Sequence, residues 1–167
     1  MWCAMRALAL IATMLIAEPA LARSAYSLVE HADKAEVKCL ADNIYFEANN
    51  QGYVGKLAVA FVTINRARDP KFPSTICKVV NQKTKDPKTG KVTCQFSWRC
   101  EKPRAVNKEQ YHNALEIAAS VYLFTELFDD PTEGSKFFHS VVVKNHPFFK
   151  QLEFATQIGD HLFYYER

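Results

Sequence analysis

Glu47 is the residue whose type and setting best suit acid–base chemistry. It stands in the stretch NIYFEANNQG (residues 43–52), directly after three apolar or aromatic residues. Leu40 and Glu47 are seven positions apart, so on a helix, at about 100° per residue, they lie only about 20° apart around the axis. A carboxyl beside a buried face is desolvated, which disfavours its charged form and raises its pKa. A general acid at neutral pH requires such a pKa. The competing interpretation is a glutamate that reaches out to water or pairs with a base.

The residues around Glu47 predict the helix that must position it. Apolar side chains recur at helical spacing over residues 37–48, which indicates an amphipathic helix. The helix should end near Asn49-Asn50 and Gly52, residue types that tolerate the left-handed conformation of a helix C-cap. Glu47 would then lie on or beside the buried face, just before the helix ends.

Two further helices and three short strands are expected. An apolar face runs over residues 54–62, and Asp69-Pro70 stops that helix. The third helix begins at Asn107, whose side chain caps it while Gln110 reaches back, and its buried stripe runs towards residues 129–131. The strands are expected in CQFSWRC, KFFHSVVV and IGDHLFYY, at residues 94–100, 136–143 and 158–165. Helices followed by short strands predict an α+β domain.

The first 22 residues resemble a secretory signal peptide. Arg6 supplies the positive charge, residues 7–17 form an apolar run, and Pro19-Ala20-Leu21-Ala22 is typical of a cleavage site. The run is shorter than the roughly 18 residues of a membrane span. We therefore expect an exported, periplasmic or wall-associated protein with one domain over residues 23–167; an uncleaved anchor is the alternative.

Four cysteines remain once Cys3 leaves with the signal. In an exported chain, Cys39, Cys77, Cys94 and Cys100 favour two disulfides, for which three pairings are open. Cys94 and Cys100 could close a local loop, which would leave Cys39 for Cys77. A zinc site built from all four thiolates competes, but the chain has no C-x-x-C pair.

The chain is mildly basic, with a formal net charge of +3. This suits work beside anionic wall or membrane polymers. The lysines of QKTKDPKTGK (residues 82–91) are expected in a solvated loop marked by Asp86-Pro87 and Gly90. So modest a charge on an exported chain argues against nucleic acid as a partner.

Several motifs occur in a fixed order along the chain, and together they are specific. The segments that carry them are IYFEANNQG, VAFVTINRARDPKFPSTICKVVNQ, CQFSW and IGDHLFYY. Their key residues are Tyr45-Phe46-Glu47-Ala48, Asn65-Arg66, the FPSTICKVV run at 72–80, Gln95-Phe96-Ser97, His139 and the GDHLFY run at 159–164. In these motifs the chain resembles the SleB/CwlJ-type cell wall hydrolases over residues 39–164.

The resemblance implies a lysozyme-like α+β fold, mostly helical with a small antiparallel sheet. It also implies that a single glutamate, Glu47 here, cleaves peptidoglycan between N-acetylmuramic acid and N-acetylglucosamine. Glu47 would protonate the glycosidic oxygen as the sugar acquires oxocarbenium-like character. In a lytic transglycosylase the muramic 6-hydroxyl then attacks, and in a hydrolase water does. No cofactor or metal is implied, and we expect a monomer.

The chain departs from the family pattern directly after Glu47. Where the family commonly has Arg-Gly-Glu after Glu-Ala, this sequence has Asn49-Asn50-Gln51. One candidate for the second acid of a two-carboxylate glycosidase is therefore missing. This favours the one-carboxylate transglycosylase route, although Asp160 could approach in space.

Six residues are candidates for substrate contacts. Gln95 and Ser97 offer an amide and a hydroxyl to sugar polar groups, and Trp98 offers an aromatic face to a sugar ring. The histidines could orient the substrate or Glu47, although buried aromatic and histidine side chains are as often core residues. The full set is Gln95, Ser97, Trp98, His139, His161 and Tyr164.

Two other functions remain open from the sequence. A zinc-dependent wall peptidase would draw ligands from His112, His139, His146, His161 and Asp160, but no metal-binding spacing such as H-E-x-x-H occurs. A non-catalytic peptidoglycan-binding module is compatible with the altered residues that follow Glu47.

Overall fold

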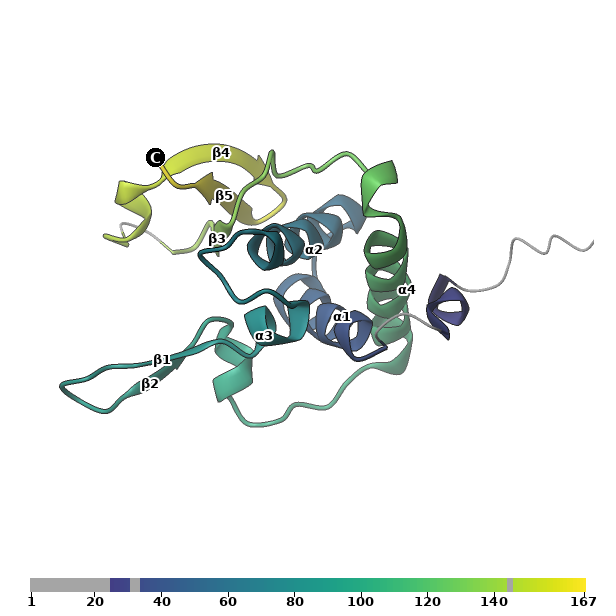
Figure 1. Cartoon of the computed structure of the whole chain (residues 1–167), viewed down its shortest axis with the longest axis horizontal. Coiled ribbons are helices and arrows are strands. Elements are labelled where there is room, and N and C mark those ends of the chain that lie inside the picture. The colour runs from purple at the N-terminus through teal and green to yellow at the C-terminus, as the bar shows by residue number, and fades with distance from the viewer. Residues whose placement is uncertain (1–24, 31–33, 144–145) are drawn as a thin grey trace, which may run out of the picture.

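The computed structural model describes residues 25–30, 34–143 and 146–167 (Figure 1). The predicted signal peptide, residues 1–22, lies outside the described residues. Within these ranges the helices are η2 (Ala25–Glu30), α1 (Lys34–Ala48), α2 (Tyr53–Arg68), α3 (Ile76–Val80), η3 (Ser97–Cys100), α4 (Lys108–Phe124), η4 (Thr125–Leu127) and η5 (Phe149–Gln151). The strands are β1 (Lys83–Lys85), β2 (Val92–Cys94), β3 (Phe137–Ser140), β4 (Glu153–Ile158) and β5 (His161–Tyr165).

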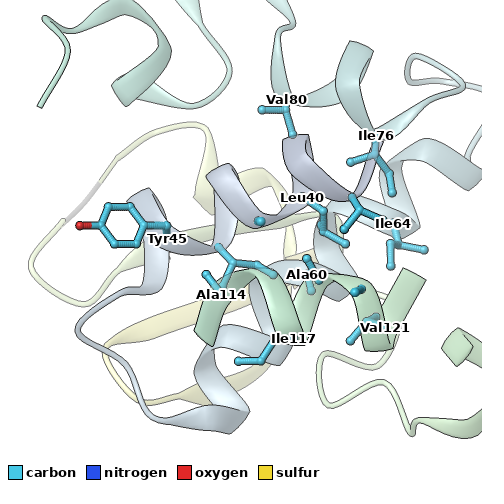
Figure 2. Close-up of a cluster of buried hydrophobic side chains, with 14 of the residues drawn as sticks. Leu40, Tyr45, Ala60, Ile64, Ile76, Val80, Ala114, Ile117 and Val121 are labelled. Carbon is cyan, nitrogen blue, oxygen red and sulfur yellow. The ribbon is translucent and has the colours of Figure 1, made fainter. Parts of the chain in front are cut away.

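Helix α1 forms the centre of the helical core and packs against α2, α3 and α4. Its apolar stripe is fully buried, as its periodicity predicts, and each such Leu or Ile side chain stabilises the fold by about 1.5–3 kcal/mol. The main core cluster joins Leu40 of α1, Ile64 of α2, Ile76 of α3 and Ile117 of α4 (Figure 2). Glu47 is thus carried on a helix that packs against three other helices.

A three-stranded antiparallel sheet packs beside the helices in the order β3-β5-β4. The central strand β5 contributes Phe163, which is fully buried against Ala58 and Val62 of α2. The predicted α+β class is confirmed. None of the described helices is long and apolar enough to cross a membrane.

The predicted lysine-rich loop is a β-hairpin rather than an irregular loop. Strands β1 and β2 pair antiparallel, with Thr84 opposite Thr93. The turn is ordered by Asp86, whose Oδ1 accepts from the backbone N–H groups of Lys88 at 2.7 Å and Thr89 at 2.9 Å. Short strands without an apolar face gave no periodic signal in the sequence.

The prediction of a strand over residues 94–100 is wrong. Only Cys94 belongs to a strand, and Ser97–Cys100 forms the 3-10 helix η3. A disulfide joins Cys94 to Cys100, whose Cα atoms are 5.8 Å apart. Six residues of extended chain would span about 20 Å, so the disulfide requires a tight turn here.

The other two strand predictions are correct in place but not in extent. Strand β3 stops at Ser140 and a turn follows, so residues 141–143 are not a strand. The segment 158–165 contains the end of β4, a turn at Gly159 with φ +56°, and β5. Strand β4 was not predicted, because it is an edge strand whose side chains are mostly exposed or half-buried.

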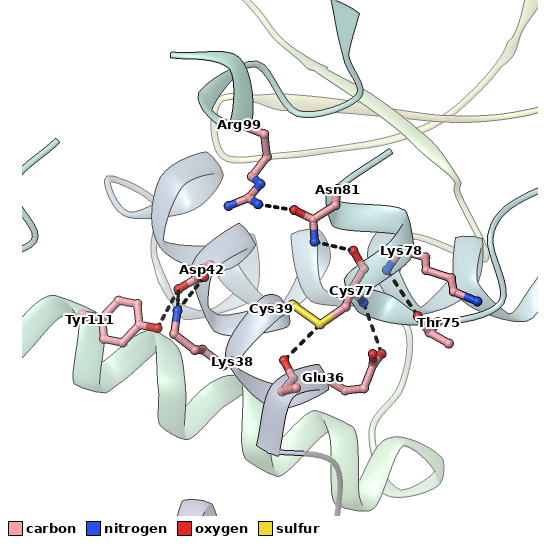
Figure 3. The surroundings of a disulfide bond; sticks show 11 residues. Glu36, Lys38, Cys39, Asp42, Thr75, Cys77, Lys78, Asn81, Arg99 and Tyr111 are labelled. Atoms are coloured by element: carbon pink, nitrogen blue, oxygen red, sulfur yellow. Dashed lines mark hydrogen bonds and ion pairs between the residues drawn. A yellow bond between two sulfur atoms is a disulfide. The ribbon is translucent and has the colours of Figure 1, made fainter. Parts of the chain in front are cut away.

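The second disulfide joins Cys39 of α1 to Cys77 of α3, and the four thiols are therefore paired rather than arranged around zinc (Figure 3). Around it, Glu36 Oε2 accepts from the Cys77 backbone N–H at 3.2 Å, and Asn81 Nδ2 donates to the Cys77 carbonyl at 2.7 Å (Figure 3). The Cys39–Cys77 disulfide fixes α3 to the first half of α1, the helix that carries Glu47 in its last turn.

Of the two capping bonds predicted at the start of α4, the structure has one. Asn107 Oδ1 accepts from the Gln110 backbone N–H at 3.0 Å, but Gln110 does not reach back. Instead the Asn107 N–H donates to Tyr45 Oη at 3.0 Å, and Gln110 Oε1 accepts from Asn49 Nδ2 at 2.8 Å. Both bonds tie α4 to the end of α1, and so hold the segment that carries Glu47.

Candidate active site

A cavity of about 720 Å³ opens between the helical core and the three-stranded sheet. Its wall on the helical side comes from the end of α1 and from α2, and the loop after β2 adds a second side. Strand β3, the turn after it and the β4–β5 turn close the third side. The volume is within the range of typical ligand pockets.

Glu47 lines this cavity from the last turn of α1. Burial raises the pKa of Glu47 from its ordinary value of 4.5 to about 7. The positive charge of Arg66 opposes this rise, Glu101 adds to it and Arg104 opposes it more weakly. The last turn of a helix also carries partial negative charge, which disfavours a carboxylate. Glu47 is therefore still partly protonated near neutral pH, so it has a proton to donate into the cavity.

Arg66 on α2 is the charged partner of Glu47, although its side chain is only 2% exposed. Its Nε donates to the Lys136 carbonyl at 2.6 Å. Burial lowers the pKa of Arg66 to about 10, against the opposing pull of Glu47, so it stays charged at neutral pH. Its Nη1 has no hydrogen-bond partner among the described residues. Its guanidinium carbon lies 5.3 to 5.7 Å from the ring centres of Phe96, Phe72 and Phe137.

Gln51 explains the departure from Arg-Gly-Glu in physical terms. Its Oε1 accepts from the Asp160 backbone N–H at 3.0 Å, and its Nε2 donates to Asp160 Oδ2 at 3.1 Å. A glutamate here would lack the donor and would face the Asp160 carboxylate. A Cβ on Gly159 would stand 2.2 Å from Gln51 Oε1 and would displace the Gln51 side chain, and the φ of +56° at Gly159 also favours glycine. The Asp160 carbonyl in turn accepts from the Val141 N–H at 2.9 Å, which holds the β4–β5 turn to the turn after β3.

Four of the six predicted contact residues line the cavity together with Glu47. Gln95 and Ser97 are exposed on the loop after β2, and His139 and His161 come from β3 and β5. His161 is 6% exposed, and its burial lowers its pKa. The charge of Asp160 opposes this lowering, and His139 adds to it. His161 is therefore neutral at physiological pH.

The other two predicted residues lie outside the lining of this cavity. Trp98 stacks on Phe46 with ring centres 4.5 Å apart, and its Nε1 donates to Asn43 Oδ1 at 3.2 Å. Tyr164 supports the cavity from behind, because its Oη lies 3.1 Å from Nε2 of His139. Through these contacts, Trp98 packs on the end of α1 and Tyr164 holds the His139 side chain.

Three residues of the site were not among the predicted contact residues. Arg66 belongs to the Asn65-Arg66 motif, which marked its position at the end of an apolar helix but did not assign it a contact. Gln51 and Asp160 are 109 residues apart, so their pairing becomes visible only in the fold.

The acidic, histidine and cysteine side chains that the structure describes are not grouped as metal ligands. Within residues 25–30, 34–143 and 146–167, no group of three or more His, Cys, Asp or Glu side chains could hold a metal ion. Each nitrogen of His139 has an oxygen partner: Nδ1 lies 2.8 Å from the Ser140 carbonyl and Nε2 lies by Tyr164.

Two solved structures are similar to this chain. The catalytic domain of Bacillus cereus SleB matches with a TM-score of 0.56 at 20% identity, over 80% of this chain and 91% of that one. The catalytic domain of the germination-specific lytic transglycosylase SleB from Bacillus anthracis matches with a TM-score of 0.58 at 19% identity, over 81% and 98%. At these identities the likeness shows the lysozyme-like α+β fold.

The family model for cell wall hydrolases matches residues 50–164, which is more than half of the chain. Glu47 lies just before the matched range, so the match itself does not include this carboxyl. No curated protein matches the sequence significantly. The matched range includes Arg66, the loop after β2 and the sheet side of the cavity wall, and the resemblance found in the motifs is confirmed: the chain belongs to the cell wall hydrolase family.

Proposed function

We propose that this enzyme cleaves the glycan strands of peptidoglycan between N-acetylmuramic acid and N-acetylglucosamine, with Glu47 as the catalytic acid. The observation that carries the proposal is a largely buried carboxyl with a raised pKa that lines a cavity of ligand-binding size. Burial raises the pKa of Glu47 to about 7, which is where a general acid works best at neutral pH. Membership of the cell wall hydrolase family supports the substrate.

The reaction follows from the position of Glu47. Its carboxyl proton passes to the glycosidic oxygen while the bond to the sugar C1 breaks and the sugar acquires oxocarbenium-like character. The carboxylate that remains is stabilised by the Arg66 charge. It then takes a proton from the attacking hydroxyl, which returns Glu47 to its starting state.

The arrangement favours the muramic 6-hydroxyl over water as the attacking group. A two-carboxylate glycosidase needs a second acid near the first. Asp160 also lines the cavity, but its carboxylate accepts a hydrogen bond from Gln51. The charges that shift the pKa of Glu47 are those of Arg66, Glu101 and Arg104, and Asp160 is not among them. The similar protein from B. anthracis is described as a lytic transglycosylase. We therefore propose lytic transglycosylase activity.

Export is part of the proposal. Residues 1–22 would direct the chain out of the cytoplasm, and the domain over residues 23–167 would act as a monomer in the periplasm or at the wall. The two disulfides support this location, because such bonds persist in oxidising compartments.

Mass spectrometry of the products tests the proposed reaction. Purified protein is incubated with purified sacculi, and the released muropeptides are analysed. We expect fragments that end in anhydro-muramic acid. Fragments with reducing muramic ends would replace the transglycosylase assignment with a hydrolase, and no release at all would remove the enzymatic proposal.

A further inference from the structure

A groove of about 390 Å³ lies beside the Glu47 cavity and is lined by residues of α1 and of the 98–106 segment. Neighbouring residues of the chain line the two hollows, because Glu47 and Ser97 face the cavity while Phe46 and Trp98 face the groove. Ser97 Oγ donates to Glu101 Oε1 at 3.1 Å, which joins a residue of the cavity lining to one of the groove lining. The groove therefore adjoins the candidate catalytic glutamate on two separate segments.

Each of two stacked aromatic rings in the groove carries an arginine. Phe46 and Trp98 stack with ring centres 4.5 Å apart. The guanidinium carbon of Arg104 lies 5.4 Å from the centre of the Phe46 ring, and that of Arg99 lies 5.0 Å from the Trp98 ring. A guanidinium that lies over a ring keeps its N–H groups available for an anion. The aromatic pair thus holds two cations in place at the groove.

The charged side chains of the groove leave positive charge without an acidic partner. The two acids of the lining are already engaged: Asp42 Oδ2 lies 2.8 Å from Lys38 Nζ, and Glu101 Oε2 lies 3.5 Å from Arg104 Nη2.

The other two cations of the lining are Arg99 and Lys102. Arg99 donates to the neutral side chain of Asn81 (Figure 3). Lys102 is exposed and has no ion-pair partner in the part of the chain that the structure describes. Both positive charges are therefore available to an anionic ligand.

These features suit a ligand that carries carboxylates. Guanidinium and ammonium groups form charge-assisted hydrogen bonds with carboxylate oxygens, whereas the hydroxyl and N-acetyl groups of a glycan are neutral. In peptidoglycan, carboxylates are carried by the short peptide attached to N-acetylmuramic acid, the sugar that the proposed function places at Glu47. An extended peptide of about four residues spans about 13 Å. A peptide that starts from a sugar in the cavity can therefore reach the groove that adjoins Glu47 and Ser97.

We propose that this groove binds the acidic stem peptide of the N-acetylmuramic acid residue whose glycosidic bond lies at Glu47. The inference rests on the proposed function and extends it from the glycan to the peptide that the glycan carries. Arg99 and Lys102 bind the peptide carboxylates, and Trp98 supports the Arg99 guanidinium. The enzyme accordingly binds strands that retain their peptides more tightly than strands that have lost them.

Equilibrium binding to two forms of the glycan tests this preference. The protein carries Glu47→Gln, so that no turnover interferes. The ligands are soluble glycan strands with stem peptides and the same strands after an amidase has removed the peptides, which leaves only the lactyl carboxylate on each muramic acid. We expect the peptide-bearing strands to bind more tightly. Adding Arg99→Gln and Lys102→Gln should weaken their binding about threefold to tenfold, the range for loss of two exposed charge pairs, and should leave the peptide-free strands unaffected.

Two further variants separate recognition from effects on the fold or on total charge. Lys102→Gln alone should weaken binding of the peptide-bearing strands in the same direction, and it leaves the arginine on Trp98 in place. Lys88→Gln with Lys91→Gln is the matched control, because it removes the same charge from exposed positions of the β1–β2 turn. This control should bind both ligands as the parent does. Added salt should reduce the preference for peptide-bearing strands, because exposed charges are screened.

Three results would overturn the proposal. They are equal binding of the two ligands by the parent, unchanged binding of peptide-bearing strands in both groove variants, and equal weakening with peptide-free strands, which would indicate a glycan contact instead. Cleavage of sacculi by the wild-type protein is measured separately. Loss of cleavage alone removes the proposed function, and loss of the peptide preference alone removes the role of the groove.

Discussion

Glu47 shows how a single position in a helix changes the chemistry of a carboxyl. The side chain lies on the border of the buried stripe of α1, and burial raises its pKa to about 7 although Arg66 opposes the shift. The sequence predicted the direction of this shift from helical geometry alone. It did not predict Arg66 as the opposing charge, because Arg66 reaches the cavity from another helix.

The raised pKa has a consequence for stability. In the unfolded chain the carboxyl titrates near 4.5, and in the folded protein near 7. Between these values the folded protein keeps a proton that the unfolded chain has released, so stability falls as the pH rises. Glu47→Gln removes the cost of burying the charge. We expect the variant and the wild type to be similar at pH 4, and the variant to be more stable by about 3 kcal/mol at pH 8.

Urea unfolding at both pH values measures this difference. A variant that is equally stable or less stable than the wild type at pH 8 would show that the Glu47 carboxylate is not buried at a cost.

At the scale of elements, the contact between Gln51 and the β4–β5 turn joins the helical and sheet walls of the cavity. Gln51→Glu removes the donor to Asp160 Oδ2 and places two carboxylates together. An unsatisfied buried polar group costs about 1–3 kcal/mol. We expect destabilisation of that size at pH 8 and less at pH 4, where the pair can share a proton. Thermal unfolding of the variant at the two pH values is the measurement.

Gln157→Glu is the matched control, because Gln157 is exposed and its Nε2 donates to Gly159 in the same turn at 3.3 Å. We expect a change within about 0.5 kcal/mol. Equal losses for the two variants would mean that Gln51 has no special role in joining the walls.

The long helices could be predicted from the sequence and the short elements could not. Helices α1, α2 and α4 have buried stripes of several turns, and Asn107 and Asp69 mark ends that the structure confirms. Helix α3 has only five residues, too few for a periodic pattern. The CQFSWRC segment has strand-like residues, but its disulfide imposes a turn.

The candidate site divides in the same way. Gln95, Ser97, His139 and His161 came from motifs, and the fold gathers them around one cavity with Glu47. Trp98 had the residue type of a sugar-stacking group, but its indole is already stacked on Phe46. A sequence motif gives the order of residues along the chain, and packing decides which face of each residue remains open.

At the scale of the whole molecule, the helical core provides a rigid support and the β elements complete the cleft. The Cys39–Cys77 disulfide and the bonds from α4 hold the helix that carries Glu47. The three-stranded sheet and the loop after β2 then close the cavity that Glu47 lines. The proposed function therefore depends on Glu47, which the helices support and the cavity surrounds.

The most direct test of that account is the rate at which Glu47→Gln cleaves glycan in purified sacculi, with Glu101→Gln as the control carboxyl. Glu101 acts on the pKa of Glu47 but does not line the cavity. Loss of a general acid typically slows a reaction by a factor of about 100 to 10,000. We predict a loss of this size for Glu47→Gln with an unchanged circular dichroism spectrum, and a rate within about tenfold of wild type for Glu101→Gln. A folded Glu47→Gln protein that releases muropeptides at the wild-type rate would contradict the account.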